Sequence, residues 1–131
     1  SDGSAGGSFA QAPAKKTGPS RMRGDPAPIY ADAFALCEWL LGRLDGDSRV
    51  LAKQICEDAL ALLEALGLAL KGIRVGAQLD EADERLYALR LKLRLAAALR
   101  LLSQEQLVFA YQATDAIGRQ LGGWLRSLGP T

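Results

Sequence analysis

Between Pro28 and Pro130 the chain contains no proline, and leucine and alanine dominate that stretch. Proline breaks α-helices more strongly than any other residue, whereas leucine and alanine are among the best helix formers. Apolar residues also recur at intervals of three and four along this stretch, the spacing that places them on one helix face. The sequence therefore predicts an all-α fold, an antiparallel up-down-up-down four-helix bundle with helices at about 28–44, 48–72, 79–102 and 104–127.

The first segment differs from the rest in composition. Residues 1–21 are rich in Gly, Ala and Ser and have no apolar periodicity. This composition is typical of a linker or an appended segment. Because 49% of the whole chain is apolar, residues 22–131 hold enough apolar side chains for one core, and we expect them to form a single domain.

Two connections between the expected helices carry turn and capping signals. Gly46 suits a left-handed position at the end of the first helix, and Asp47 or Ser48 can cap the second. Ser103 is expected to cap the fourth helix, with Gln106 completing a capping box. Connections this short require neighbouring helices to run antiparallel.

The residue types argue against an enzyme, a metal site or a cofactor site. The chain has no His and only two cysteines, Cys37 and Cys56, which lack CxxC spacing and are expected to be buried thiols rather than a disulfide. No phosphate-binding glycine loop or nucleophile–base pair is recognisable. The carboxylates at 80–84 are explained by a helix start, where the dipole favours them. No apolar run is long enough to span a bilayer, so we expect a soluble, cytoplasmic protein without a membrane partner.

Charge is distributed unevenly along the chain. From residue 85 onward seven basic residues face two acidic ones, a net charge of +5, whereas residues 22–84 hold six basic and twelve acidic residues, a net charge of −6. Scattered charges on helices are often simply solvated, but a basic half can also serve an anionic partner. The candidate nucleic-acid-binding residues are Arg85, Arg90, Lys92, Arg94, Arg100, Arg119 and Arg126.

The segment 79–102 places leucine on two opposite sides of one helix. Leu86, Leu89 and Leu93 share one side, and the other side carries the candidate oligomer interface, which consists of Leu91, Leu95, Leu99 and Leu102. A bundle helix needs one apolar stripe, so the second stripe indicates a further packing surface. The alternative is that both sides face neighbouring helices of the same bundle.

The end of the last helix is rich in glycine. Gly118 and Gly122 lie one above the other, and together with Gly123 they remove side chains from part of the helix surface. We expect another backbone to approach closely there, and Trp124 to close the end of the bundle rather than to stack on a base.

Two stretches, ERLYALRLKLRLAAALRLLSQEQ at 84–106 and IGRQLGGWLRS at 117–127, resemble the accessory variability determinant (Avd) family of diversity-generating retroelements. The chain is more distantly similar to the four-helix proteins encoded within ribosomal RNA intervening sequences. The resemblance covers about residues 30–128. It differs in charge, since the family tends to be strongly basic and this chain has a formal net charge of +1.

The resemblance implies a four-helix bundle that assembles into a barrel-like homopentamer. It also implies association with the retroelement's reverse transcriptase and with template RNA or an RNA–cDNA hybrid, in support of mutagenic cDNA synthesis. Two alternatives stay open: a purely structural oligomeric adaptor, or an orphan bundle of the intervening-sequence type that does not bind nucleic acid.

Overall fold

The structure is a computed structural model that describes residues 27–129. The expected linker at 1–21 lies outside the described residues. Within them the chain forms four helices, α1 (Pro28–Leu44), α2 (Val50–Leu70), α3 (Val75–Ala98) and α4 (Gln104–Ser127).

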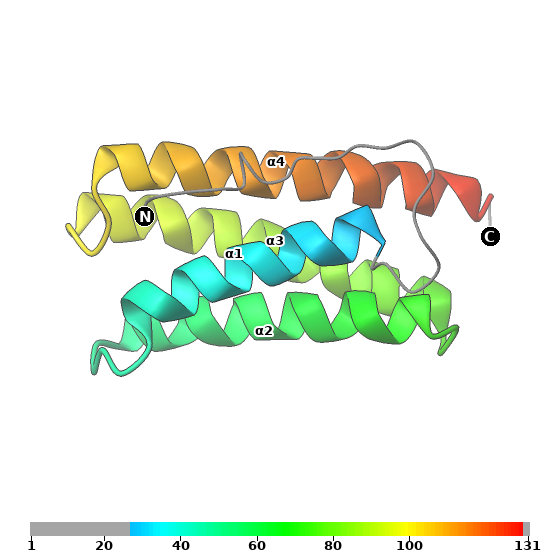
Figure 1. Cartoon of the computed structure of the whole chain (residues 1–131), viewed down its shortest axis with the longest axis horizontal. Helices are drawn as coiled ribbons and strands as arrows, with labels where there is room; N and C mark the ends of the chain where they lie inside the picture. The colour runs from blue at the N-terminus through cyan, green and yellow to red at the C-terminus, as the bar shows by residue number, and fades with distance from the viewer. Residues whose placement is uncertain (1–26, 130–131) are drawn as a thin grey trace.

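The helices form an antiparallel bundle in which each helix packs against two neighbours (Figure 1). α1 contacts α2 and α4, α3 contacts the same two helices, and the diagonal pairs do not approach each other. In Figure 1, α1 crosses the front of the bundle and α3 lies behind it, between α4 and α2. The predicted up-down-up-down four-helix bundle is confirmed.

The core follows a heptad-like spacing of three and four residues, typical of helices packed at a small angle. In α3 the buried positions with this spacing are Leu79, Ala82, Leu86, Leu89, Leu93 and Ala96, and Ala97 is buried beside them. In α2 they include Ala52, Ile55, Ala59, Leu62, Leu66 and Ala69. Small alanines alternate with leucines, so the helices can interdigitate without leaving voids.

Both cysteines are free thiols buried in this core, as the sequence indicated. Cys37 Sγ donates a hydrogen bond to the carbonyl oxygen of Ala59 at 3.1 Å, which links α1 to α2. Burial, with a smaller contribution from the nearby Cys56, raises the pKa of the Cys37 thiol to about 11. These thiols therefore pack as small apolar groups.

The turn between α1 and α2 differs in one detail from the expectation. Gly46 has a φ of 86°, in the left-handed region as predicted. The N-cap of α2, however, is Arg49, and no side chain caps it. Asp47 instead accepts hydrogen bonds from the Arg49 backbone N–H at 2.9 Å and from its guanidinium at 2.6 Å.

The predicted bounds of the third helix, 79–102, are displaced by four residues, because α3 begins at Val75 and ends at Ala98. Arg100 adopts the left-handed conformation with a φ of 68°. The Leu101 N–H then bonds to the Ala96 carbonyl at 2.8 Å, and the Arg100 N–H bonds to the Ala97 carbonyl at 3.1 Å. This pattern is a Schellman motif, which ends the helix at an arginine where a glycine would have been the usual signal.

The early start of α3 also corrects the explanation of its carboxylates. The first turn, after the left-handed residue Arg74, contains no acidic residue. Asp80, Glu81, Asp83 and Glu84 therefore lie one turn or more into the helix, where the dipole has little effect.

The start of α4 confirms the predicted capping box. Ser103 Oγ accepts a hydrogen bond from the Gln106 N–H at 3.1 Å, and Gln106 Oε1 accepts one from the Ser103 N–H at 2.9 Å. Two backbone donors at this helix end are thereby satisfied. Among the residues described, no helix is both long and apolar enough to cross a membrane.

Candidate functional site

A strip of leucines lies on the outer face of α3, directly opposite its core positions. Leu91, Leu95 and Leu99 are 56%, 49% and 56% exposed, while Leu89 and Leu93 are fully buried. The alternative in which both leucine sides face neighbouring helices is therefore wrong for these three residues. We call Leu91, Leu95 and Leu99, together with Tyr87, the leucine strip.

Two residues change the predicted strip. Leu102 is 2% exposed and belongs to the core, because α3 ends at Ala98 and the chain turns inward before α4. It is therefore removed from the candidate interface. Tyr87, one turn before Leu91, is 66% exposed and extends the strip toward the start of α3. Tyr87 is four residues before Leu91, so the spacing of the strip predicts Tyr87 as well when aromatic residues are included with the leucines.

Two candidate nucleic-acid-binding residues bind a carboxylate that the sequence analysis missed. Asp58 lies on α2 and is 5% exposed. Arg85 donates to Asp58 Oδ1 at 2.9 Å, and Lys92 donates to Asp58 Oδ2 at 2.6 Å. Arg85 also lies 3.4 Å from Glu81. Arg85 and Lys92 therefore share their charges with carboxylates of the same chain and join α3 to α2.

Arg90 occupies the seam between α3 and α4. Its NH1 group donates to Thr114 Oγ1 at 2.6 Å and to Asp115 Oδ1 at 2.7 Å, and its guanidinium lies 4.5 Å from the centre of the Tyr111 ring. An open depression of about 410 Å³ adjoins this cluster and is lined by Leu86, Arg90, Thr114, Asp115, Gly118 and Arg119. Asp115 therefore competes with an incoming phosphate for the NH1 group of Arg90.

Four candidate cations remain exposed, and no ion pair is recorded for them among residues 27–129. They are Arg94, Arg100, Arg119 and Arg126. Because α3 and α4 run antiparallel (Figure 1), their connected ends lie at one end of the bundle and their other ends at the opposite end. By their position in the sequence, Arg94 and Arg100 are near the α3–α4 turn, whereas Arg119 and Arg126 are in the second half of α4. The structure therefore does not gather the seven predicted residues into one surface of the chain.

Among the described residues, no other backbone approaches the glycines near the end of α4. A side chain at Gly118 would meet only Leu86, with its Cβ 3.5 Å from Leu86 Cδ2. At Gly122 and Gly123 the nearest group is the Arg126 guanidinium of the same helix. The expected close backbone approach is therefore not found here. Trp124 is partly buried and packs against the core.

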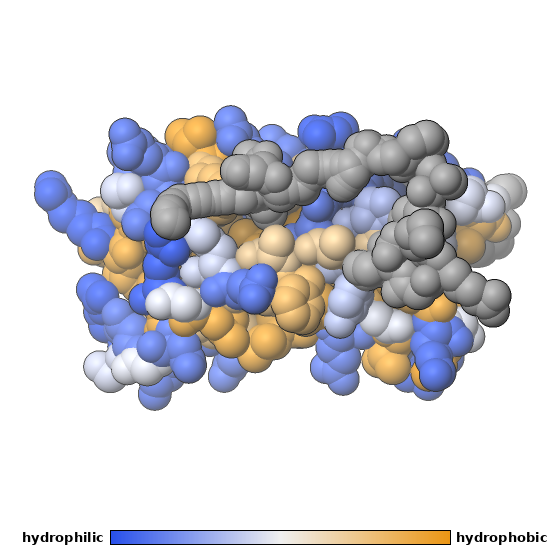
Figure 2. All heavy atoms as spheres, in the orientation of Figure 1, coloured by the Kyte–Doolittle hydropathy of each residue, from blue (hydrophilic) through white to orange (hydrophobic). Residues whose placement is uncertain are grey.

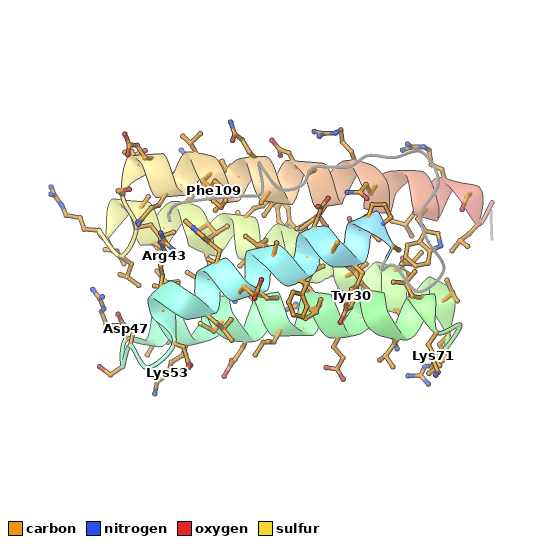
Figure 3. All side chains as sticks on the ribbon, viewed as in Figure 1. Tyr30, Arg43, Asp47, Lys53, Lys71 and Phe109 are labelled. Atoms are coloured by element: carbon orange, nitrogen blue, oxygen red, sulfur yellow. The ribbon has the colours of Figure 1, made fainter. Side chains whose placement is uncertain are left out.

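A second apolar surface, which sequence reasoning missed, lies between α1 and α2 (Figure 2). Phe34 of α1 and Leu60 of α2 are both exposed, and Leu41 and Leu63 are partly buried beside them. Tyr30 lies in the same seam (Figure 3), and a Cβ on Gly67 would be 3.6 Å from its ring. We call the apolar seam between these two helices, formed by Tyr30, Phe34, Leu41, Leu60 and Leu63, the α1–α2 groove.

No family model matches the chain, and no curated protein or solved structure matches it either. Within the part of the chain that the structure describes, no group of three or more His, Cys, Asp or Glu side chains could hold a metal ion. The surfaces available for a functional argument are the leucine strip, the α1–α2 groove and the four exposed arginines.

Proposed function

We propose that the chain is the accessory subunit of a diversity-generating retroelement, similar to the Avd family. In this role it self-associates and holds the reverse transcriptase together with template RNA or the RNA–cDNA hybrid. Two features support the proposal: the four-helix bundle and the sequence of α3 and α4, from Glu84 to Gln106 and from Ile117 to Ser127.

The observation that carries the proposal is the exposed leucine strip on a helix whose opposite face is already buried. A subunit with an apolar strip of this kind gains free energy by covering it, and another copy of the same chain is always available as the cover. Self-association then repeats the exposed arginines. Several weak contacts on linked copies act at high effective concentration, which makes modest individual sites useful for binding a long phosphate chain.

Arginine suits this task because its planar guanidinium can engage two phosphate oxygens at once. No base-reading motif accompanies the arginines, so binding should be weakly sequence-specific and steeply salt-dependent. For about four phosphate contacts on a single strand, affinity should fall about fiftyfold between roughly 50 and 200 mM salt.

The test measures binding of a labelled RNA and of an RNA–DNA hybrid at several salt concentrations, with the mass of the assembly measured in parallel. Five copies of the 14.0 kDa chain would have a mass of about 70 kDa. Arg119→Gln with Arg126→Gln should weaken binding and reduce the salt slope without changing the mass. Asp115→Asn is a useful counterpart, because freeing Arg90 should strengthen binding. Salt-independent binding would exclude phosphate contacts as its basis.

A purely structural adaptor is the alternative, and one observation favours it. Arg85, Arg90 and Lys92 already have carboxylate partners, which leaves fewer cations for RNA than the sequence indicated. If the Arg119→Gln/Arg126→Gln variant retains the reverse transcriptase and the wild type binds no RNA, this alternative is correct. The orphan intervening-sequence type would instead lack a reverse transcriptase gene beside its own.

A further inference from the structure

The leucine strip and the α1–α2 groove lie on different sides of the bundle. The strip faces outward from α3, whereas the groove lies between α1 and α2, and α1 is diagonally across the bundle from α3 (Figure 1). One copy can therefore present both surfaces at once, to two different neighbours. This arrangement allows a head-to-tail contact, in which the strip of one copy packs against the α1–α2 groove of the next.

The charges beside the two surfaces are complementary in order and spacing. On α2, Lys53 and Glu64 are exposed on either side of Leu60 along the helix, and Lys53 extends from the outer edge of α2 (Figure 3). On α3, Glu84 and Arg94 are exposed on either side of Leu91. At 1.5 Å per residue the first pair is separated by about 16 Å along its axis and the second by about 15 Å.

We propose that α3 of one copy docks parallel to α2 of a second copy, with its leucine strip in the α1–α2 groove. In this register Glu84 faces Lys53, Leu91 faces Leu60 and Arg94 faces Glu64 of the second copy. No ion pair is recorded within residues 27–129 for these four charged side chains, so each is free to form one across the contact.

The groove also supplies a side chain between the leucines. Cys37 Sγ donates a hydrogen bond to the Ala59 carbonyl at 3.1 Å, and Tyr30 lies beside Gly67. These two contacts fix the position of α1 along the axis of α2. Phe34, between Tyr30 and Cys37 in sequence, therefore lies near the level of Leu62 and Leu63. In the proposed register that level falls between Leu91 and Leu95 of the docked helix, where an exposed ring can pack against both.

A symmetric contact between two leucine strips is less favourable. An antiparallel pair that places leucine on leucine is centred on Leu93 or on Leu95, and either register brings the two copies' Arg94 side chains onto the same turn. A different antiparallel register could place Arg94 of one copy opposite the acidic residues at 80–84 of the other copy. In that register Leu95 also lies opposite those acidic residues. Like charges brought together, or an apolar side chain covered by carboxylates, both oppose association.

This inference rests on the self-association in the proposed function and specifies its geometry. A head-to-tail contact generates a closed ring if the rotation between copies closes and an open chain if it does not. Arg94 is covered by the next copy in this arrangement, so contact with phosphate is left to Arg100, Arg119 and Arg126.

The test uses two variants of the full chain, with light scattering at micromolar concentration and circular dichroism to verify folding. The strip variant carries Leu91→Lys and Leu95→Lys, and the groove variant carries Phe34→Lys and Leu60→Lys. Each should be a folded monomer alone. Mixed in equal amounts they should form a dimer of two 14.0 kDa chains, because one intact strip and one intact groove remain. Val108→Lys, an exposed apolar position on α4, should assemble like the wild type.

Charge reversal tests the register. Arg94→Glu and Glu64→Arg should each raise the dissociation constant about three- to tenfold, and the double variant should restore it.

A groove variant that assembles like the wild type overturns the inference and leaves the proposed self-association intact. A reverse transcriptase surface would then be the occupant of the groove. A mixture of the two variants that stays monomeric also overturns it. If the wild type itself is monomeric, the proposed function fails as well.

Discussion

Lys92 Nζ lies 2.6 Å from Asp58 Oδ2, so a cation of α3 is bonded to the one carboxylate that is buried among the described residues. Arg85 donates to the other oxygen of the same carboxylate at 2.9 Å. A carboxylate removed from water is costly unless its charge and its lone pairs are compensated. Two cations that lie two turns apart on α3 provide that compensation and fix the position of α3 along α2.

Asp58→Asn should lower the free energy of unfolding by about 1–3 kcal/mol, because two cations then face a neutral amide that cannot accept from both. Asp115→Asn is the matched control: its ion pair with Arg90 is equally short at 2.7 Å, but Asp115 is exposed, so the loss should stay below about 1 kcal/mol. Urea unfolding of the two variants measures the difference. Equal losses would mean that burial does not strengthen the Asp58 pairs.

Alanine at Gly118 or Gly122 should raise the free energy of unfolding by about 0.5–1 kcal/mol each, because glycine inside a helix loses more backbone entropy on folding. The space permits it, since the nearest atoms belong to the Leu86 and Arg126 side chains at 3.5 and 3.4 Å. Gly72→Ala is the control and should destabilise, because its φ of 89° strains any residue with a Cβ. Higher stability combined with weaker self-association would indicate that a second copy approaches α4 at these glycines.

Asp47 should titrate at an unusually low pH. Its hydrogen bonds from Arg49 lower its pKa from the ordinary 3.8 to about 2. A carboxyl whose pKa is lowered by folding contributes stability above its ordinary pKa, and that contribution is lost as the pH falls from about 4 to about 2. Carboxyl chemical shifts followed by NMR against pH measure the midpoint directly. Arg49→Gln should return the midpoint toward 3.8, and a wild-type midpoint already at that value would contradict the bonding described.

Cys37 should react slowly with alkylating reagents in the folded chain. With a pKa of about 11, only about one thiol in a thousand is ionised at pH 8, compared with about one in ten at the ordinary value of 9.0. Mass spectrometry after a timed pulse of iodoacetamide measures the modification. Urea-unfolded chain provides the reference rate, and labelling of the folded chain at that rate would show that Cys37 is accessible.

The helices could be predicted from the sequence because leucine and alanine recur at three- and four-residue intervals, and because Ser103 and Gln106 mark a start without any tertiary information. The end of α3 could not, since its left-handed residue is Arg100 rather than a glycine. The earlier end of α3 also explains why Leu102 is buried. The predicted helix to residue 102 placed Leu102 on the outer face, whereas the observed turn places it in the core.

The candidate surfaces were predicted only in part, for a related reason. Helical angles show that Leu91 and Leu95 oppose Leu93, so their exposure follows from one helix alone. The partners of Arg85 and Lys92 depend on how α3 slides along α2, and Asp58 is 27 and 34 residues away from them in sequence. The α1–α2 groove likewise combines residues of two helices, and its existence depends on their relative height.

Leu95→Lys with Leu99→Lys should leave the isolated subunit folded, with its free energy of unfolding changed by about 0.5 kcal/mol or less, because both side chains already contact water. Leu93→Lys, two residues before Leu95 but fully buried, should cost several kcal/mol or prevent folding, because an ammonium group would enter the core unpaired. Urea unfolding in dilute solution, where association contributes little, separates the two effects. If the Leu95→Lys/Leu99→Lys variant unfolds as readily as Leu93→Lys, the outer face of α3 is held by its own subunit, and no leucine strip is left for a second copy to cover.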